Sequence, residues 1–153
     1  MTVTVNPVSP SLPRRLAAMV YDTFLVVALV AVVNAVALGI VVKLSAGAQQ
    51  VLDPQLVQVL TALSITGFFS VFWLHSGQTL GMQAWRIQLV DFDGNTPSLG
   101  KALIRCLGAT LSFACLGLGY LWCLVDRRHR YWHDYLSHTE LILVPKQQDR
   151  TAA

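Results

Sequence analysis

Three long apolar runs separated by short polar stretches make up most of the chain. The first, residues 16–42, contains a single charge, Asp22, and its last twenty residues carry none. The second and third, residues 56–74 and 106–125, carry no charge at all. A helix of about 20 apolar residues crosses a hydrocarbon core of about 30 Å. The pattern therefore predicts two membrane-spanning helices and a third helical segment, with expected ranges of about 14–43, 55–75 and 99–126.

The third run is compatible with two topologies. Gly117 and Gly119 lie inside it, and the basic residues 127–130 follow it directly. Lys and Arg number two before the first run, one after it, three in residues 77–105 and five after residue 125. Because cytoplasmic loops are rich in Lys and Arg, we expect the N-terminus and residues 77–105 in the cytoplasm. A third crossing would place five basic residues outside, whereas a re-entrant segment that breaks at the glycines would keep them inside.

Two short stretches outside the helices have the pattern of strands. Trp85, Ile87 and Leu89 alternate with polar residues, and this period of two is typical of a half-buried strand. A matching apolar run, residues 141–144, lies near the C-terminus. We expect the two stretches to pair as a small cytoplasmic β-ribbon. The predicted fold class is thus an all-α membrane protein with two to three transmembrane helices, the third crossing or re-entrant, and this ribbon.

Composition supports a membrane protein. The chain is 54% hydrophobic and 12% charged, and a mean hydropathy of +0.55 does not describe a soluble domain. The net charge of +3 comes from scattered basic residues, which form no contiguous basic domain and argue against nucleic acid as a partner. We expect one membrane domain over residues 13–144, a flexible N-terminal tail over residues 1–12 and a polar C-terminal tail over residues 145–153.

Asp22 is the most unusual residue of the first run. A carboxylate inside a membrane helix costs about 2.5–3.5 kcal/mol even on lenient insertion scales, so it needs a partner. Arg15 precedes it by seven residues, on the same helical face and about 10 Å away along the axis. One hypothesis is that Asp22 binds a proton or a cation in turn, as proton-coupled transporters require. The other is a structural ion pair between Arg15 and Asp22, with Asp134 or a tail arginine folded over them.

Asn34, His129 and His133 are the other polar residues with the chemistry of a ligand. Asn34, deep in the first run, is expected to hydrogen-bond a neighbouring helix rather than to bind an ion. His129 and His133 are four apart and could ligate a metal from one helical face, but no further ligands complete such a site. The sequence contains no nucleophile elbow, phosphate-binding glycine loop or HExxH motif. We therefore expect no enzymatic activity, metal or cofactor.

Several stretches together resemble the RDD family of small bacterial membrane proteins. They are residues 15–22, Gln78-Thr79-Leu80-Gly81, Arg86-Ile87, Asp91-Phe92-Asp93-Gly94, Arg105, Trp132-His133-Asp134 and Ser137-His138-Thr139. Mapped onto this chain, the arginine and two aspartates that name the family are Arg15, Asp22 and Asp134. We expect these three to form a polar cluster, with Arg105, Asn34 and His133 as supporting residues. Tyr135 and His138 depart from the family pattern, which has a basic residue or glycine and a glycine there, without affecting the three namesakes.

The resemblance implies a multi-pass protein of the bacterial inner membrane, and transport has been suggested for the family, some members being reported as cation/proton antiporters. One hypothesis is therefore a transport-related protein that handles monovalent cations or protons. It would work as a homo-oligomer or with other membrane subunits, because two or three helices hardly enclose a polar path. The alternative is a structural or accessory module, in which the arginine and aspartates form a salt-bridged cytoplasmic layer without a transported substrate.

Overall fold

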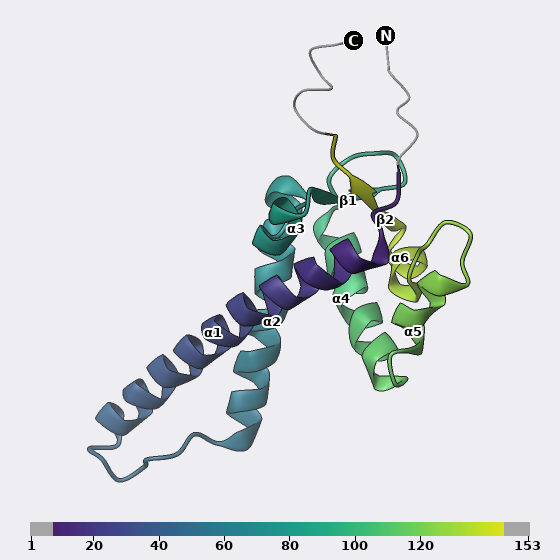
Figure 1. The fold of residues 1–153 in the computed structure, drawn as a ribbon. Helices are drawn as coiled ribbons and strands as arrows, with labels where there is room; N and C mark the ends of the chain where they lie inside the picture. The colour runs from purple at the N-terminus through teal and green to yellow at the C-terminus, as the bar shows by residue number, and fades with distance from the viewer. Residues whose placement is uncertain (1–7, 146–153) are drawn as a thin grey trace.

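A computed structural model describes residues 8–145 of the 153-residue chain (Figure 1). The predicted tail residues 1–7 and 146–153 lie outside the described part. The elements are α1 (Leu12–Leu44), α2 (Pro54–Ser76), α3 (Leu80–Ala84), β1 (Ile87–Asp91), α4 (Leu99–Ala114), α5 (Leu118–Leu121), the 3-10 helix η1 (Trp122–Leu124), α6 (Trp132–Ser137) and β2 (Thr139–Leu143). The predicted fold class is confirmed: the protein is mainly helical, with two to three candidate membrane spans and a two-stranded ribbon.

The two long helices, α1 and α2, form the membrane-spanning part of the fold. Both are long and apolar enough to cross a bilayer. Asp53 caps the start of α2, because its carboxylate accepts a hydrogen bond of 2.8 Å from the backbone N–H of Gln55. Gly77 ends α2 in the left-handed conformation, with φ of 69°. The halves of α1 and α2 that adjoin their connecting loop extend well away from the rest of the molecule (Figure 1).

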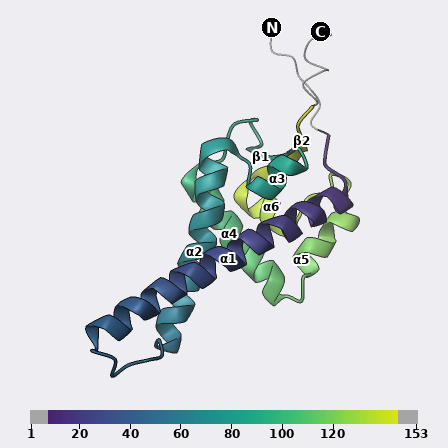
Figure 2. The same cartoon turned by 60° about the vertical axis from the view of Figure 1, so that its left-hand side comes forward.

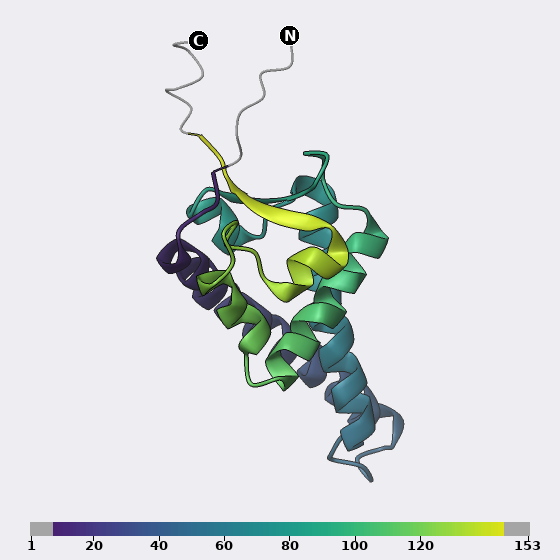
Figure 3. The same cartoon turned by 90° about the vertical axis from the view of Figure 1, so that its right-hand side faces the viewer.

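The third apolar run is broken. Helix α4 ends at Ala114, Leu116 and Gly117 have positive φ values of 55° and 78°, and the short helices that follow are bent by 106° from α4. The chain then turns back beside α4 (Figure 3). Arg105, near the start of α4, donates to the hydroxyl of Thr139, which follows α6. The contact places the first half of α4 beside the start of β2.

The ribbon is the predicted one, with slightly different bounds. Strands β1 and β2 pair antiparallel, with Ile87 opposite Leu143 and Leu89 opposite Leu141. Ile87 and Leu89 are only 1% and 0% exposed, which explains the alternating pattern of the sequence. The N-terminal segment continues this layer, because the backbone N–H of Leu143 donates to the carbonyl of Val8.

The buried core lies at the ribbon end of the molecule. Its members come from α1, α2, α3, β1 and α4, and they are Ala18, Trp73, Met82, Ile87, Leu89 and Ala102. Outside this core the long helices have few neighbours: Val36 of α1 and Leu63 of α2 are 58% and 64% exposed. Figure 2 shows the far halves of α1 and α2 projecting away from the other elements. The ribbon end therefore holds the polar residues in place, while the opposite end presents apolar side chains.

Candidate functional site

Asp22 fastens α1 to the start of α3. The side chain is 4% exposed. One carboxylate oxygen accepts a hydrogen bond from the hydroxyl of Thr79, and the other accepts one of 2.8 Å from the backbone N–H of Gly81. Thr79 in turn caps α3, because its hydroxyl oxygen accepts from the backbone N–H of Met82 at 3.2 Å. The buried carboxylate is thus held by neutral donors rather than by a basic side chain.

Gly81 makes this contact possible. A Cβ at this position would lie 2.8 Å from the nearer Asp22 oxygen and would also collide with the carbonyl oxygen of Ala18. Only a residue without a side chain lets α3 lie directly on the backbone of α1. Thr79 and Gly81 were singled out in the sequence by the family resemblance, but nothing in their spacing identified them as the partners of Asp22.

Arg15 does not pair with Asp22. Its Nε donates to the carbonyl of Pro10 at 2.9 Å, and its Nη1 donates to the carbonyl of His129 at 2.6 Å. Its guanidinium lies over the ring of Tyr131, 5.1 Å from the centroid. No acidic side chain within residues 8–145 forms an ion pair with it. The structural hypothesis of an Arg15–Asp22 pair is therefore wrong, because Arg15 extends to the N-terminal side of α1 whereas Asp22 turns to α3.

Asp134 forms a separate buried ion pair with Arg105. The two side chains are 1% and 5% exposed. Arg105 also donates to the hydroxyl of Thr139 at 2.8 Å, and the second oxygen of Asp134 accepts from the backbone N–H of Tyr131 at 2.8 Å. The Arg105 guanidinium lies over the ring of Trp73, 5.4 Å from the centroid. This network ties α2, α4, α6 and the start of β2 together.

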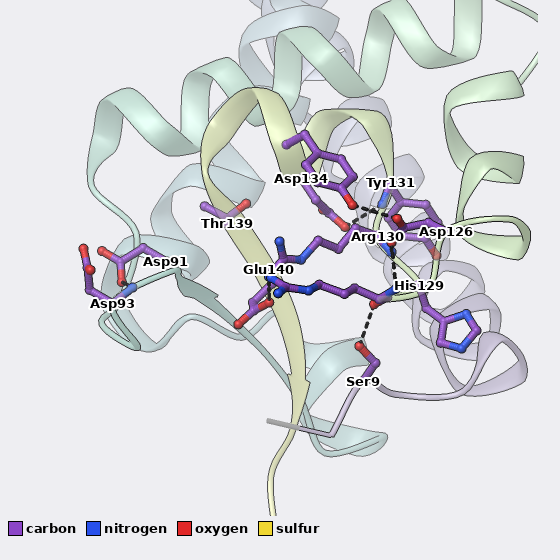
Figure 4. Close-up of polar contacts among 12 residues, drawn as sticks. Ser9, Asp91, Asp93, Asp126, His129, Arg130, Tyr131, Asp134, Thr139 and Glu140 are labelled. Atoms are coloured by element: carbon purple, nitrogen blue, oxygen red, sulfur yellow. Dashed lines mark hydrogen bonds and ion pairs between the residues drawn. The ribbon is translucent and has the colours of Figure 1, made fainter. Parts of the chain in front are cut away.

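A second group of charges lies nearer the surface. Arg130 forms an ion pair with Glu140 on β2, as Figure 4 shows. Asp126 accepts backbone hydrogen bonds from Arg130 at 2.9 Å and from Arg128 at 3.0 Å. Burial acts to raise the pKa of Asp126, but these two hydrogen bonds and one from the Tyr135 hydroxyl outweigh it, so the pKa lies below its usual value. The sequence analysis did not predict this group. Its only signal in the sequence is that acidic and basic residues both occur within residues 126–140.

His133 lies buried on α6, against α4. It is 3% exposed, and burial together with the charge of Arg105 lowers its pKa to about 2. A Cβ on Gly108 would lie 2.9 Å from the Cβ of His133, so the two helices touch there. His129 lies in the loop before α6 with φ of 54°, so His129 and His133 do not share one helical face. Within the described residues no three His, Cys, Asp or Glu side chains gather as metal ligands.

Asn34 differs from its prediction. Its Nδ2 donates to the carbonyl of Val30 at 2.9 Å, which lies one turn earlier in the same helix. Its Oδ1 is buried and has no hydrogen-bond partner within the described residues. The expected bond to a neighbouring helix is therefore not formed in the single chain. Within the described residues, Asn34 forms no hydrogen bond with Arg15, Asp22 or Asp134.

A cavity of about 360 Å³ brings most of the predicted residues together. Arg15, Asp22, Arg105 and His133 line it, whereas Asp134, the ion-pair partner of Arg105, does not. The rest of the lining is largely apolar or aromatic. Most of it comes from α1, α2 and α4, including Met19, Ile65, Phe69, Trp73 and Phe113, and the remainder includes Met82, Ile87, Tyr120, Tyr131 and Leu141. The volume falls in the range of about 300–1,000 Å³ that is usual for small-molecule sites. The arrangement can therefore bind a ligand at a boundary between polar and apolar surroundings.

Comparison with known proteins gives one match. The family model described as the RDD family matches residues 9–138, which include every residue of the cavity lining except Leu141. No curated protein and no solved structure matches the chain.

Proposed function

The chain belongs to the RDD family, and from this premise we propose that it has a transport-related role in the bacterial inner membrane. In this proposal Asp22 binds a proton or a monovalent cation in turn, and the protein exchanges the two across the membrane. The observation that carries the proposal is the position of Asp22, an acid only 4% exposed that lines the cavity. It has no basic partner within residues 8–145. Buried membrane carboxylates of this kind are typical of ion and proton pathways.

The distribution of basic residues supports a cytoplasmic ribbon. Residues 8–145 contain nine Lys and Arg, of which Lys43 alone lies at the loop end of α1. The other eight belong to the ribbon end and are Arg14, Arg15, Arg86, Lys101, Arg105, Arg127, Arg128 and Arg130. From the positive-inside rule we infer that the ribbon and the start of α1 face the cytoplasm, and that α4, α5 and η1 form a re-entrant segment.

Exchange across the bilayer also requires more than one chain. The cavity lies at the ribbon end, and the far halves of α1 and α2 present exposed apolar side chains such as Val36 and Leu63. A single pair of helices does not enclose a polar path through the other half of the membrane. We therefore propose a homo-oligomer or an assembly with other membrane subunits, in which neighbouring helices cover these surfaces.

A structural role is the second candidate, and the Arg105–Asp134 network favours it. This pair is almost fully buried, and it joins α4 and α6 to the ribbon. Asp134 does not line the cavity. In this alternative the charged residues build a salt-bridged cytoplasmic layer, and Asp22 only holds α3 on α1. Buried ion pairs are weak evidence for stability but can fix one arrangement of elements.

Ion flux in reconstituted vesicles separates the two candidates. Asp22→Asn keeps an oxygen for the Gly81 N–H and an amide that can donate to the Thr79 hydroxyl, so the α1–α3 contact should survive. Asp53→Asn is the matched control, because Asp53 is exposed at the opposite end of α2 and asparagine also caps helices well.

Under the transport proposal, wild-type protein and Asp53→Asn exchange Na⁺ or K⁺ for protons across the vesicle membrane, and Asp22→Asn does not. All three should reconstitute in similar yield. Equal flux in Asp22→Asn and wild type would contradict the proposal. A wild type without flux above that of empty vesicles, combined with poor accumulation of Asp134→Ala, would favour the structural candidate.

A further inference from the structure

We propose that the cavity holds the phosphate and part of one acyl chain of a phospholipid from the surrounding bilayer, with the phosphate at Arg15 and the acyl chain along α2 and α4. This site goes beyond the exchange role of Asp22 and does not depend on it. Three observations support this site: Arg15 has no acidic partner within residues 8–145, the cavity lining is largely apolar, and lining residues on the membrane-spanning helices are exposed.

The polar end has more donors than acceptors. Arg15 has five N–H donors, and two of its nitrogens donate to the backbone carbonyls of Pro10 and His129, which leaves donors for a further partner. Arg15 is therefore a cationic donor without an acidic partner within residues 8–145.

A phosphate group fits these donors. Its oxygens accept several hydrogen bonds and carry the charge that Arg15 lacks among its protein partners. The acidic residue in the lining, Asp22, follows Arg15 by seven residues, which is about 10 Å along the helix. Both Asp22 oxygens already accept hydrogen bonds from Thr79 and Gly81, so they do not compete for the same donors.

Along α2 and α4 the charged and indole side chains of the lining lie at the ribbon end, and the lining farther along both helices is mainly apolar, with Thr66 and Thr110 as the polar members. On α2, Trp73 lies at the ribbon end, and Ile65 lies eight residues, or about 12 Å, farther from it. On α4, Arg105 lies at the ribbon end, and Phe113 lies eight residues farther. A headgroup at the ribbon end would therefore have its acyl chain among apolar side chains of the membrane-spanning region.

The cavity is accessible from the membrane side. Met19 of α1 and Ile65 of α2 are 43% and 37% exposed, and Phe113 of α4 is 79% exposed, although all three line the cavity. These helices would face the hydrocarbon core, so a bilayer lipid can enter between them. This access favours a lipid phosphate over free phosphate, which would have to cross an apolar lining.

Lipid titration of the full chain in detergent, followed by native mass spectrometry, tests the proposal. The probes are phosphatidylglycerol, a diacylglycerol with the same chains but no phosphate, and inorganic phosphate as competitor. Phosphatidylglycerol should bind one molecule per chain, at least about tenfold more tightly than diacylglycerol, as loss of a charged hydrogen-bond partner implies. Competition by inorganic phosphate at low millimolar concentration would instead identify a free anion as the ligand and overturn the lipid assignment.

Two variants localise the binding. Arg15→Gln should bind phosphatidylglycerol about tenfold more weakly, whereas Arg14→Gln, its neighbour outside the cavity, should bind within twofold of wild type. Equal affinity in the two variants would overturn the proposal. If Arg15→Gln does not fold, Ala109→Leu carries the test, because it adds bulk to the lining on α4 and should weaken binding about fivefold or more. An unchanged affinity in Ala109→Leu would equally overturn it.

Discussion

Replacing one member of the Arg105–Asp134 pair should destabilise the protein about as much as replacing both. The perturbations are Arg105→Met, Asp134→Asn and the double variant. Asparagine keeps an oxygen that can accept from the Tyr131 N–H, so the start of α6 stays capped. Methionine keeps an unbranched apolar stem beside the Trp73 ring. Each single variant therefore removes the charge pairing with little change of shape.

The expected magnitude follows from burial. The side chains of Arg105 and Asp134 are 5% and 1% exposed, so removal of either leaves the other charge buried without its partner. Such a loss costs about 3–5 kcal/mol of the free energy of unfolding. In the double variant no buried charge is left, and we expect a total loss close to that of one single variant. The coupling energy between the two sites should then be about 3 kcal/mol.

The assay is denaturant unfolding of the purified protein in mixed micelles, followed by tryptophan fluorescence, for all four members of the cycle. The Lys101–Asp91 pair provides the matched control, because the Lys101 side chain is 32% exposed. Its cycle, with Lys101→Met and Asp91→Asn, should give a coupling below about 1 kcal/mol. If the loss of unfolding free energy in the double variant equals the sum of the Arg105→Met and Asp134→Asn losses to within about 0.5 kcal/mol, the two residues do not act as a buried pair.

Two further predictions concern packing and pH. Gly81→Ala should lower the free energy of unfolding by about 1–3 kcal/mol, because its Cβ would overlap Asp22, whereas Gly100→Ala should be neutral or stabilising, since nothing lies within 4 Å of that position. Similar losses in both would contradict the close α1–α3 contact. Burial, together with the charge of Arg105, lowers the pKa of His133 from 6.5 to about 2. Below pH 6.5 the unfolded chain therefore binds one proton more than the native state, so the free energy of unfolding should decrease as the pH is lowered. Between pH 6.5 and pH 5 we expect a loss of about 2 kcal/mol that is absent in His133→Gln, and an equal loss in that variant would refute the assignment.

The parts of the fold that depend on local pattern were predictable from sequence. Runs of about twenty apolar residues marked α1 and α2, and the period of two in residues 85–89 marked the ribbon. The glycines at 117 and 119, together with the basic residues after them, left open either a full crossing or a break in the third segment, and the chain turns back there. Each of these features is encoded by neighbours in the sequence.

The contacts of the polar residues were not predictable in this way. Asp22 meets Thr79 and Gly81 from 57 and 59 positions away, and sequence spacing carries no signal of that approach. The seven-residue spacing of Arg15 and Asp22 suggested a pair, but side chains on one helical face can point to different neighbours. Asn34 bonds its own helix because the single chain offers it no polar partner within the described residues.

The most direct test of the transport proposal is whether Asp22 itself exchanges a proton for a cation. Infrared difference spectra of the protein in vesicles, recorded across a pH titration, report the C=O stretch of protonated carboxyl groups. If Asp22 exchanges a proton for a cation, we expect a carboxyl band whose titration midpoint moves to lower pH when Na⁺ or K⁺ is added. This band should vanish in Asp22→Asn and persist in Asp53→Asn. A spectrum that does not respond to cations, or a cation-sensitive band that survives in Asp22→Asn, would contradict the account.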